Sequence, residues 1–132
     1  MPERRFLLSL SRAPYGHLDG QEGLDLALVL AAFGQNVTVA LLDDGVYHLT
    51  RGQDSSALGL KPYTRQLPAL GDFDIRELIV DRAALQARGL SASQLQAVTH
   101  EDDDFNEHDS LLLLEGAALA EKLATFDIHF GF

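Results

Sequence analysis

Residues 5–33 read RFLLSLSRAPYGHLDGQEGLDLALVLAAF, and this stretch decides the fold. An apolar run, a glycine-rich connection and a longer apolar run predict a strand, a tight loop and a helix, in that order. The loop carries Gly16, Gly20 and Gly23, which indicates a defined backbone path. A strand that leads directly into a helix is the opening unit of an α/β domain.

Further apolar segments predict the remaining strands. Residues 36–42 are β-branched and mostly apolar, as a central parallel strand requires, and residues 73–80 predict the next strand. The fourth strand is either residues 96–100 or residues 111–114, and the sequence leaves both open. Residues 126–132 alternate Phe and Ile with polar residues or Gly, which predicts a last strand.

Helices are expected between these strands. Asp81 is placed to cap a helix over residues 82–88, and Gly89 is placed to close that helix in the left-handed conformation. Residues 115–124 have apolar side chains at helical spacing and predict another helix. Residues 1–132 are therefore expected to form a single-domain, three-layer α/β fold, with a mostly parallel sheet of about five strands covered by helices on both faces.

The helix predicted over residues 24–33 is apolar on almost all sides. One side is expected to cover the sheet. The apolar residues on the other side predict a second contact surface, either within the chain or with a partner subunit. Gly34 is expected to end this helix.

Acidic residues outnumber basic ones. The 132 residues include 20 Asp and Glu against 10 Lys and Arg, so the formal net charge is -10. Such a surface repels phosphate backbones, and direct nucleic-acid binding is not expected. No apolar run approaches the roughly 20 residues that span a bilayer, and the N-terminus lacks a signal-peptide pattern, so we expect a cytoplasmic protein without membrane contact.

The sequence contains no cysteine. Disulfides, thiolate metal sites and any mechanism in which this chain carries sulfur on a thiol are therefore excluded. Signatures of common enzyme classes are also absent, among them GxxxxGK[ST], GxGxxG, GxSxG and HExxH. We expect no cofactor.

The opening loop is one candidate ligand site. Glycines at the N-terminus of a helix can cradle a phosphate. Asp19, Glu22 and Asp25 bring negative charge to the same place and oppose an anion. From these residues alone the chain is an acidic α/β domain that we expect to be oligomeric.

A second candidate site follows the second strand. Asp43, Asp44 and Gly45 lie just past the carboxyl end of that strand, where ligands usually bind in open parallel sheets. Paired carboxylates bind metals or serve as acid and base, and His48 is near enough in sequence to join them. Asp-Asp-Gly is also a common turn, and this structural interpretation is the favoured one.

Residues 101–110 are interpreted as an acidic loop insertion. His100, Asp102 and His108 are metal-ligand types in or beside this loop. A calcium-loop spacing fails because Glu107 stands where the turn requires a glycine. The two histidines also lack the spacing of a helical zinc-binding pair. A solvated loop without metal is the favoured interpretation.

Several segments of the chain resemble one known family. They are APYGHLDGQEGLDLAL, DDGVYHLTRGQ, the FDI that opens the third strand, RAALQARGL and the closing FDIHFGF. Together and in this order they are similar to the TusC/DsrF branch of the DsrE-like sulfur-relay proteins. The resemblance covers nearly the whole chain apart from the acidic loop, and it implies a DsrE-like fold.

The resemblance implies a subunit of a sulfurtransferase complex. In such complexes, TusB-like and TusD-like subunits join this one in a dimer of heterotrimers. They pass persulfide sulfur from a TusA-like donor to a TusE-like acceptor, towards 2-thiouridine at the wobble position of tRNA. The sequence leaves open whether this chain serves tRNA thiolation or dissimilatory sulfur oxidation.

The resemblance also gives Asp81 a particular position. The persulfide cysteine of TusD-like subunits matches Asp81 here, and an aspartate cannot hold a second sulfur. No catalytic residue is therefore expected in this chain. The residues expected to contact partners or shape their active site are Tyr15, Gly16, Gly20, Glu22, Asp44, Gly45, Tyr47 and Asp81.

The leading hypothesis is thus a non-catalytic structural subunit of a sulfur-relay complex. One rival hypothesis is an enzyme, or a small-ligand or metal-binding protein, that uses the crevice of Asp43, Asp44 and His48. Another is a DsrE-like protein that works alone as a homo-oligomer.

Overall fold

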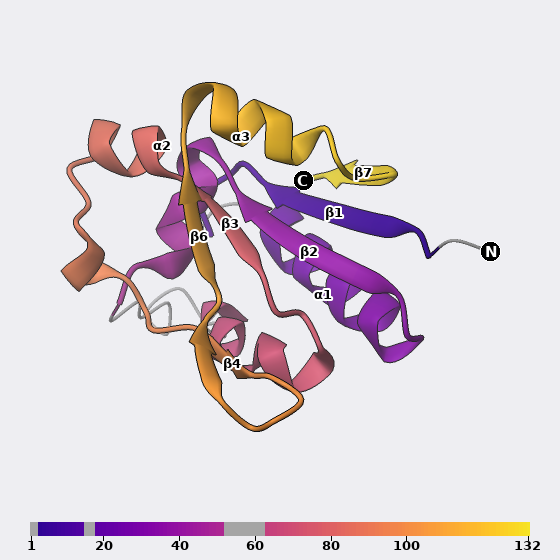
Figure 1. The fold of residues 1–132 in the computed structure, drawn as a ribbon. Coiled ribbons are helices and arrows are strands. Elements are labelled where there is room, and N and C mark those ends of the chain that lie inside the picture. Colours follow the sequence, from indigo (N-terminus) through magenta and orange to yellow (C-terminus); the bar gives the residue numbers. More distant parts are fainter. Residues whose placement is uncertain (1–2, 15–17, 52–62) are drawn as a thin grey trace.

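The computed structural model of the protein describes residues 3–14, 18–51 and 63–132 (Figure 1). Within these residues, five parallel strands form one sheet in the order β6-β3-β2-β1-β7. The strands are β1 Arg5–Leu10, β2 Asn36–Leu41, β3 Leu78–Asp81, β6 Leu111–Leu114 and β7 Ile128–Gly131. The predicted α/β class with a mostly parallel sheet is confirmed.

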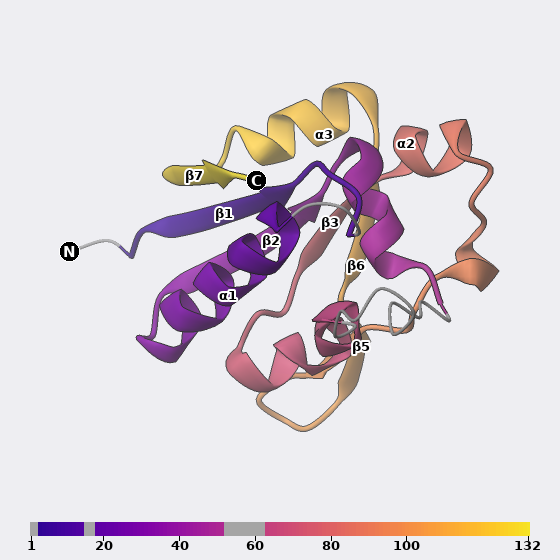
Figure 2. The same ribbon diagram turned by 180° about the vertical axis from the view of Figure 1, so that it is seen from behind.

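Helices connect the strands and cover the sheet. The α-helices are α1 Asp19–Ala32, α2 Arg82–Ala87 and α3 Gly116–Leu123, and the 3-10 helices are η1 Asp43–Leu49, η3 Tyr63–Phe73 and η4 Ala92–Gln94. A separate antiparallel hairpin joins β4 Thr99–Glu101 to β5 Glu107–Asp109. Figures 1 and 2 show α1 and α3 on opposite faces of the sheet, as the three-layer prediction requires.

The core has two parts, one on each face of the sheet. Successive side chains of a strand point to opposite faces, so β1 contributes to both parts. Leu8 and Leu10 belong to the larger part, which includes Leu24 of α1. Leu7 belongs to the smaller part, against which Leu119 of α3 packs. Because both faces of β1 are buried, the strand reads as a continuous apolar run.

The last strand packs the C-terminal end of the chain against β1 and α1. The backbone N–H of Phe132 donates to the carbonyl of Ser9 at 2.8 Å, and the N–H of Ser11 donates to the carbonyl of Phe132 at 2.8 Å. The Phe132 ring lies 2.8 Å from the point that a Cβ on Gly23 would occupy. The strand itself begins at Ile128, two residues later than the pattern predicts.

The first helix begins earlier than the sequence predicts. We expected Gly20 and Gly23 in a loop, but both lie buried inside α1, which starts at Asp19. The reason is packing: a Cβ on Gly23 would meet a methyl carbon of Leu10 at 2.7 Å, so glycine lets the first turns approach β1 closely. Gly34, with a φ of 79°, follows the helix as expected.

The third strand begins later than predicted. Phe73 still belongs to η3, and Asp74 has a φ of 63°, which turns the chain before β3 starts at Leu78. Ile75 is fully buried although it lies outside the strand. Ile75 therefore owes its apolar character to burial in the core rather than to strand geometry, whereas Phe73 is 45% exposed, and the predicted strand start at residue 73 was wrong.

The choice for the fourth strand is resolved in favour of residues 111–114, which form β6 beside β3. Of the other candidate, residues 99 and 100 lie in β4 Thr99–Glu101 of the hairpin. The acidic segment predicted as a loop is therefore partly a β-hairpin. Its side chains are mostly exposed, as expected for a charged segment, and its origin as an insertion stays a prediction.

A buried histidine makes stability depend on pH. His48 is fully buried, and its Nδ1 lies 2.8 Å from the carbonyl oxygen of Gly45. Burial lowers the pKa of His48 below its ordinary value, while the hydrogen bond to Gly45 opposes part of that shift. Because the folded state disfavours the protonated ring, this contribution to stability is complete above about pH 6.5 and falls as the pH drops below that value.

We expect the free energy of unfolding to fall as the pH drops below about 6.5, by up to roughly 1.4 kcal/mol per pH unit from His48. The His48→Gln variant should lack this part of the pH dependence, whatever its absolute stability. Urea unfolding at several pH values measures it. The same substitution at the exposed His129 is the control, and an unchanged slope in His48→Gln would contradict the assignment.

Candidate functional site

The candidate site lies where β2 and β3 end. In a parallel sheet the carboxyl ends of the strands share one edge, and loops at this edge usually form the binding site. η1 leaves β2 with Asp43 and Asp44, and α2 leaves β3 directly after Asp81. η1 and α2 pack against each other, so these residues belong to one surface.

Arg88 connects the two elements of this edge. Its Nε and Nη2 donate to the Oδ1 of Asp44 at 3.0 and 2.8 Å, and its Nη1 donates to the carbonyl of Ala84 at 3.1 Å. The guanidinium also lies over the ring of Tyr47, 6.0 Å from its centroid. The hydrogen bond from Arg88 to Asp44 raises the pKa of Arg88 and keeps this residue charged.

Asp81 is the N-cap of α2, as predicted. Its Oδ1 accepts a hydrogen bond from the backbone N–H of Ala84 at 3.3 Å. Gly89 closes the short helix with a φ of 67°, also as predicted. A cap of this kind contributes about 1 kcal/mol, which is a structural role that Asp81 fulfils without any partner chain.

Gly45 brings η1 into contact with the end of β1. Its N–H donates to the carbonyl of Leu42 at 2.7 Å, and the N–H of Leu42 donates to the carbonyl of Leu10 at 3.0 Å. A Cβ on Gly45 would lie 1.7 Å from that same carbonyl oxygen. No side chain other than hydrogen fits there. Asp43 enters the turn with a φ of 48°, in the left-handed region.

The proposed crevice of Asp43, Asp44 and His48 does not assemble into a common site. His48 lies inside the core, whereas Asp44 is half-exposed and pairs with Arg88. Among residues 3–14, 18–51 and 63–132, no group of three or more His, Asp or Glu side chains is arranged to hold a metal ion. The geometry therefore does not favour the ligand-binding rival.

The residues of the opening loop divide into two groups. Tyr15 and Gly16 lie outside the described residues. Gly20 is buried and Glu22 is exposed, both in the first turns of α1 near the carboxyl end of β1. Gly20 therefore serves packing, and Glu22 stays a predicted contact residue.

Sequence reasoning missed Arg88 as a residue of this edge. The signal was present, since Arg88 follows the last turn of α2 and can point back towards η1. What the sequence does not contain is the distance between η1 and α2. An apolar groove of about 500 Å³ also lies elsewhere, beside β6 and the hairpin, and His108 lines it, but none of the residues expected to contact partners does.

Within the described part of the chain, no helix combines the length and the apolar character that crossing a bilayer demands.

A parallel sheet between helical layers, with polar side chains gathered where β2 and β3 end, defines a three-layer α/β protein of the doubly wound class. Within that class, the chain belongs to the DsrE/DsrF-like family, whose model matches residues 4–128.

Several relatives match almost the whole chain. The intracellular sulfur oxidation protein DsrF of Allochromatium vinosum is 38% identical over 131 residues, which cover 98% of this chain and 96% of the relative. The protein TusC of Escherichia coli is 32% identical over 125 residues, which cover 95% of this chain and 96% of the relative. The predicted family is thus confirmed.

A solved structure supports the fold. The crystal structure of the ychN protein from Escherichia coli superposes with a TM-score of 0.71 at 19% identity, over 99% of this chain and 100% of that chain. At this identity the likeness concerns the fold alone.

The contact at Gly45 is testable by substitution. Gly45→Ala should reduce the free energy of unfolding by roughly 3 kcal/mol or more, or prevent folding, because the new methyl group meets backbone rather than a movable side chain. Gly131→Ala is the matched control: its Cβ would be 3.6 Å from the Oγ of Ser9, an ordinary contact, and the loss should stay below about 1 kcal/mol. Equal urea midpoints for the two variants would contradict this packing.

Proposed function

We propose that the chain is a non-catalytic structural subunit of a heteromeric sulfur-relay complex. The observation that carries the proposal is full-length similarity to proteins named DsrF and TusC in a chain without cysteine. A persulfide needs a thiol to carry it, and this chain offers none. The sulfur must then be carried by another subunit.

The proposed companions are TusB-like and TusD-like subunits in a dimer of heterotrimers. The complex takes persulfide sulfur from a TusA-like donor and gives it to a TusE-like acceptor in the cytoplasm, towards 2-thiouridine in tRNA. The first relative carries the words sulfur oxidation in its name, so a dissimilatory role is the alternative destination of the sulfur. The proposed role of this subunit is the same in tRNA thiolation and in dissimilatory sulfur oxidation.

One face of α1 offers a surface for a companion subunit. Leu18 and Val29 expose 66% and 52% of their surface, and Phe33 at the end of the helix exposes 80%. The opposite face of α1 packs on the sheet through Leu24 and Ala27. Exposed apolar side chains along one helix are typical of a subunit interface, which agrees with the predicted second contact of this helix.

The candidate site fits a supporting role. Asp81 already uses its carboxylate to cap α2, and Asp44 is held by Arg88. An ordered, charged edge of this kind can position the sulfur-carrying loop of a companion without reacting itself. The residues proposed for such contacts are Tyr15, Gly16, Glu22, Asp44, Tyr47 and Asp81. Gly20 and Gly45, which were also expected there, are buried and shape the edge from within.

Co-expression with TusB-like and TusD-like chains should yield a complex of all three subunits. In a gel-shift assay with a persulfide-loaded TusA-like donor, the isolated chain should take up no sulfur, whereas the complex should take it up on the TusD-like subunit. Val29→Lys should weaken co-purification, because it places a charge in the proposed apolar contact. The exposed position Ala83 in α2, changed to Lys, is the control.

The proposed function would be contradicted if the chain bound neither the TusB-like nor the TusD-like subunit. A defined homo-oligomer in analytical ultracentrifugation, together with no binding to the companions, would instead support the stand-alone protein.

The Asp81→Cys variant tests the position of the missing thiol. We expect the variant to accept sulfur from the same donor within the complex, since its Sγ would stand at the N-terminus of α2, where a thiolate is favoured. Ala83→Cys is the control. Residue 83 lies two positions further along the chain and is exposed, and this variant should accept much less sulfur. Equal uptake at both positions would argue against a degenerate carrier site.

A further inference from the structure

A second surface lies at the opposite edge of the sheet. The end of η3 and the β4–β5 hairpin stand at the amino ends of β3 and β6, away from α2 at the carboxyl ends (Figures 1 and 2). η3 packs against β4, so the two elements form one surface. We call it the amino-edge patch, and it consists of Asp72, Phe73, Asp74, Asp103, Asp104 and Phe105.

Two aromatic side chains of the amino-edge patch face solvent. Phe105 at the tip of the hairpin is 81% exposed, and Phe73 at the end of η3 is 45% exposed. Single exposed apolar residues are common, but Phe105 exposes most of its ring at a hairpin tip, and Phe73 adds a second exposed ring at the end of η3. Aromatic rings of this kind are the usual anchors of protein interfaces.

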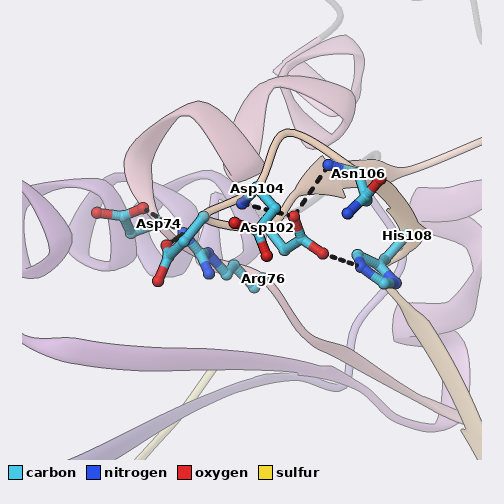
Figure 3. A network of polar contacts seen from close by, with 7 residues as sticks. Asp74, Arg76, Asp102, Asp104, Asn106 and His108 are labelled. Carbon is cyan, nitrogen blue, oxygen red and sulfur yellow. Dashed lines mark hydrogen bonds and ion pairs between the residues drawn. The ribbon is translucent and has the colours of Figure 1, made fainter.

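The tip that carries Phe105 is held in one conformation by Asp102 (Figure 3). The Oδ1 of Asp102 accepts hydrogen bonds from the backbone N–H groups of Asp104 and Asn106, both at 2.9 Å. Its Oδ2 lies 2.7 Å from the Nε2 of His108. The hydrogen bond from His108 is the main reason that the pKa of Asp102 falls to about 2, so this carboxylate stays charged and keeps its partners at neutral pH.

The hairpin is also fixed to the body of the domain. The Nη2 of Arg76 lies 3.2 Å from the Oδ1 of Asp103 in the hairpin and 3.6 Å from the Oδ1 of Asp74, which follows η3. One guanidinium thus joins the two elements that carry Phe105 and Phe73. The Phe105 ring is presented on a prearranged surface, which lowers the entropy cost of binding.

The charge of the amino-edge patch selects the kind of partner. Asp74 and Asp103 expose 87% and 94% of their side chains, and Asp72 and Asp104 are exposed as well. Among the ion pairs of the described residues, Arg76 is the only cation that pairs with any of these four carboxylates. A net negative surface repels nucleic acid and anionic lipid and attracts a basic protein surface.

From these observations we propose that the amino-edge patch binds a basic partner protein, which receives the Phe105 ring in an apolar socket bordered by Lys or Arg side chains. Aromatic anchors inside a charged rim are typical of complexes that form and dissociate, whereas permanent subunit contacts are more apolar. The inference goes beyond the proposed function and uses a different edge of the sheet, so either can fail without the other.

Site-specific photo-crosslinking in a lysate of the source cells, where the salt concentration can be set, tests the proposal. The full chain carries a benzophenone side chain in place of Phe105, and the control carries it in place of Gln86, an exposed residue of α2 at the other edge. We expect a cross-link from position 105, mapped by mass spectrometry to a segment of another protein that contains Lys or Arg. The control position should not give this product.

The charge requirement is tested on the same product. Asp104→Lys reverses one exposed charge and keeps the backbone N–H that binds Asp102, so the hairpin should stay folded. We expect this substitution to lower the cross-linking yield about tenfold. Raising NaCl to about 0.5 M, where the screening length is roughly 4 Å, should lower it similarly.

Three results would overturn the proposal. The first is no product from position 105 above the control at position 86. The second is a product whose yield does not change with Asp104→Lys or with salt. The third is a salt-resistant product with a companion subunit or a second copy of this chain, because the patch would then be a permanent subunit contact.

Discussion

The close packing around Leu10 at the end of β1 is the constraint on which the rest of the structure depends. Its carbonyl accepts the N–H of Leu42, which ties β2 to β1, and leaves room for no more than a hydrogen on Gly45. Its side chain meets Gly23 of α1, where the Phe132 ring also packs. One residue thus sets how closely α1, η1 and the last strand approach the sheet. The carboxyl edge is shaped by these contacts.

The two ends of the sheet differ in physical character. At the carboxyl edge, the guanidinium of Arg88 pairs with the carboxylate of Asp44, and the carboxylate of Asp81 caps α2. Both carboxylates therefore have partners inside the domain. At the amino edge, Phe105 and the carboxylates around it face solvent on a rigid hairpin. The first arrangement suits a stable contact, and the second suits a reversible contact.

Much of the fold could be predicted because several signals are local. Asp81 and Gly89 mark the two ends of α2 through hydrogen bonds and a left-handed φ that involve only their neighbours. The alternation of strands and helices follows from side-chain periodicity, and it was sufficient for the α/β class. The family was predicted from the resemblance of several ordered motifs. The site was less predictable: Arg88 was missed, and only the tertiary structure decided that His48 is a core residue rather than a member of the Asp43 and Asp44 crevice.

The sequence by itself determined the class of fold, the caps, the absence of a thiol and the acidic surface, because each depends on composition or on residues a few positions apart. Tertiary structure alone decided that Gly20 and Gly23 lie inside α1, that β3 begins at Leu78, and that residues 111–114 take the fourth place in the sheet. The ion pair between Arg88 and Asp44 likewise depends on how η1 packs against α2. These outcomes depend on contacts between segments far apart in the chain, where burial overrides the local pattern.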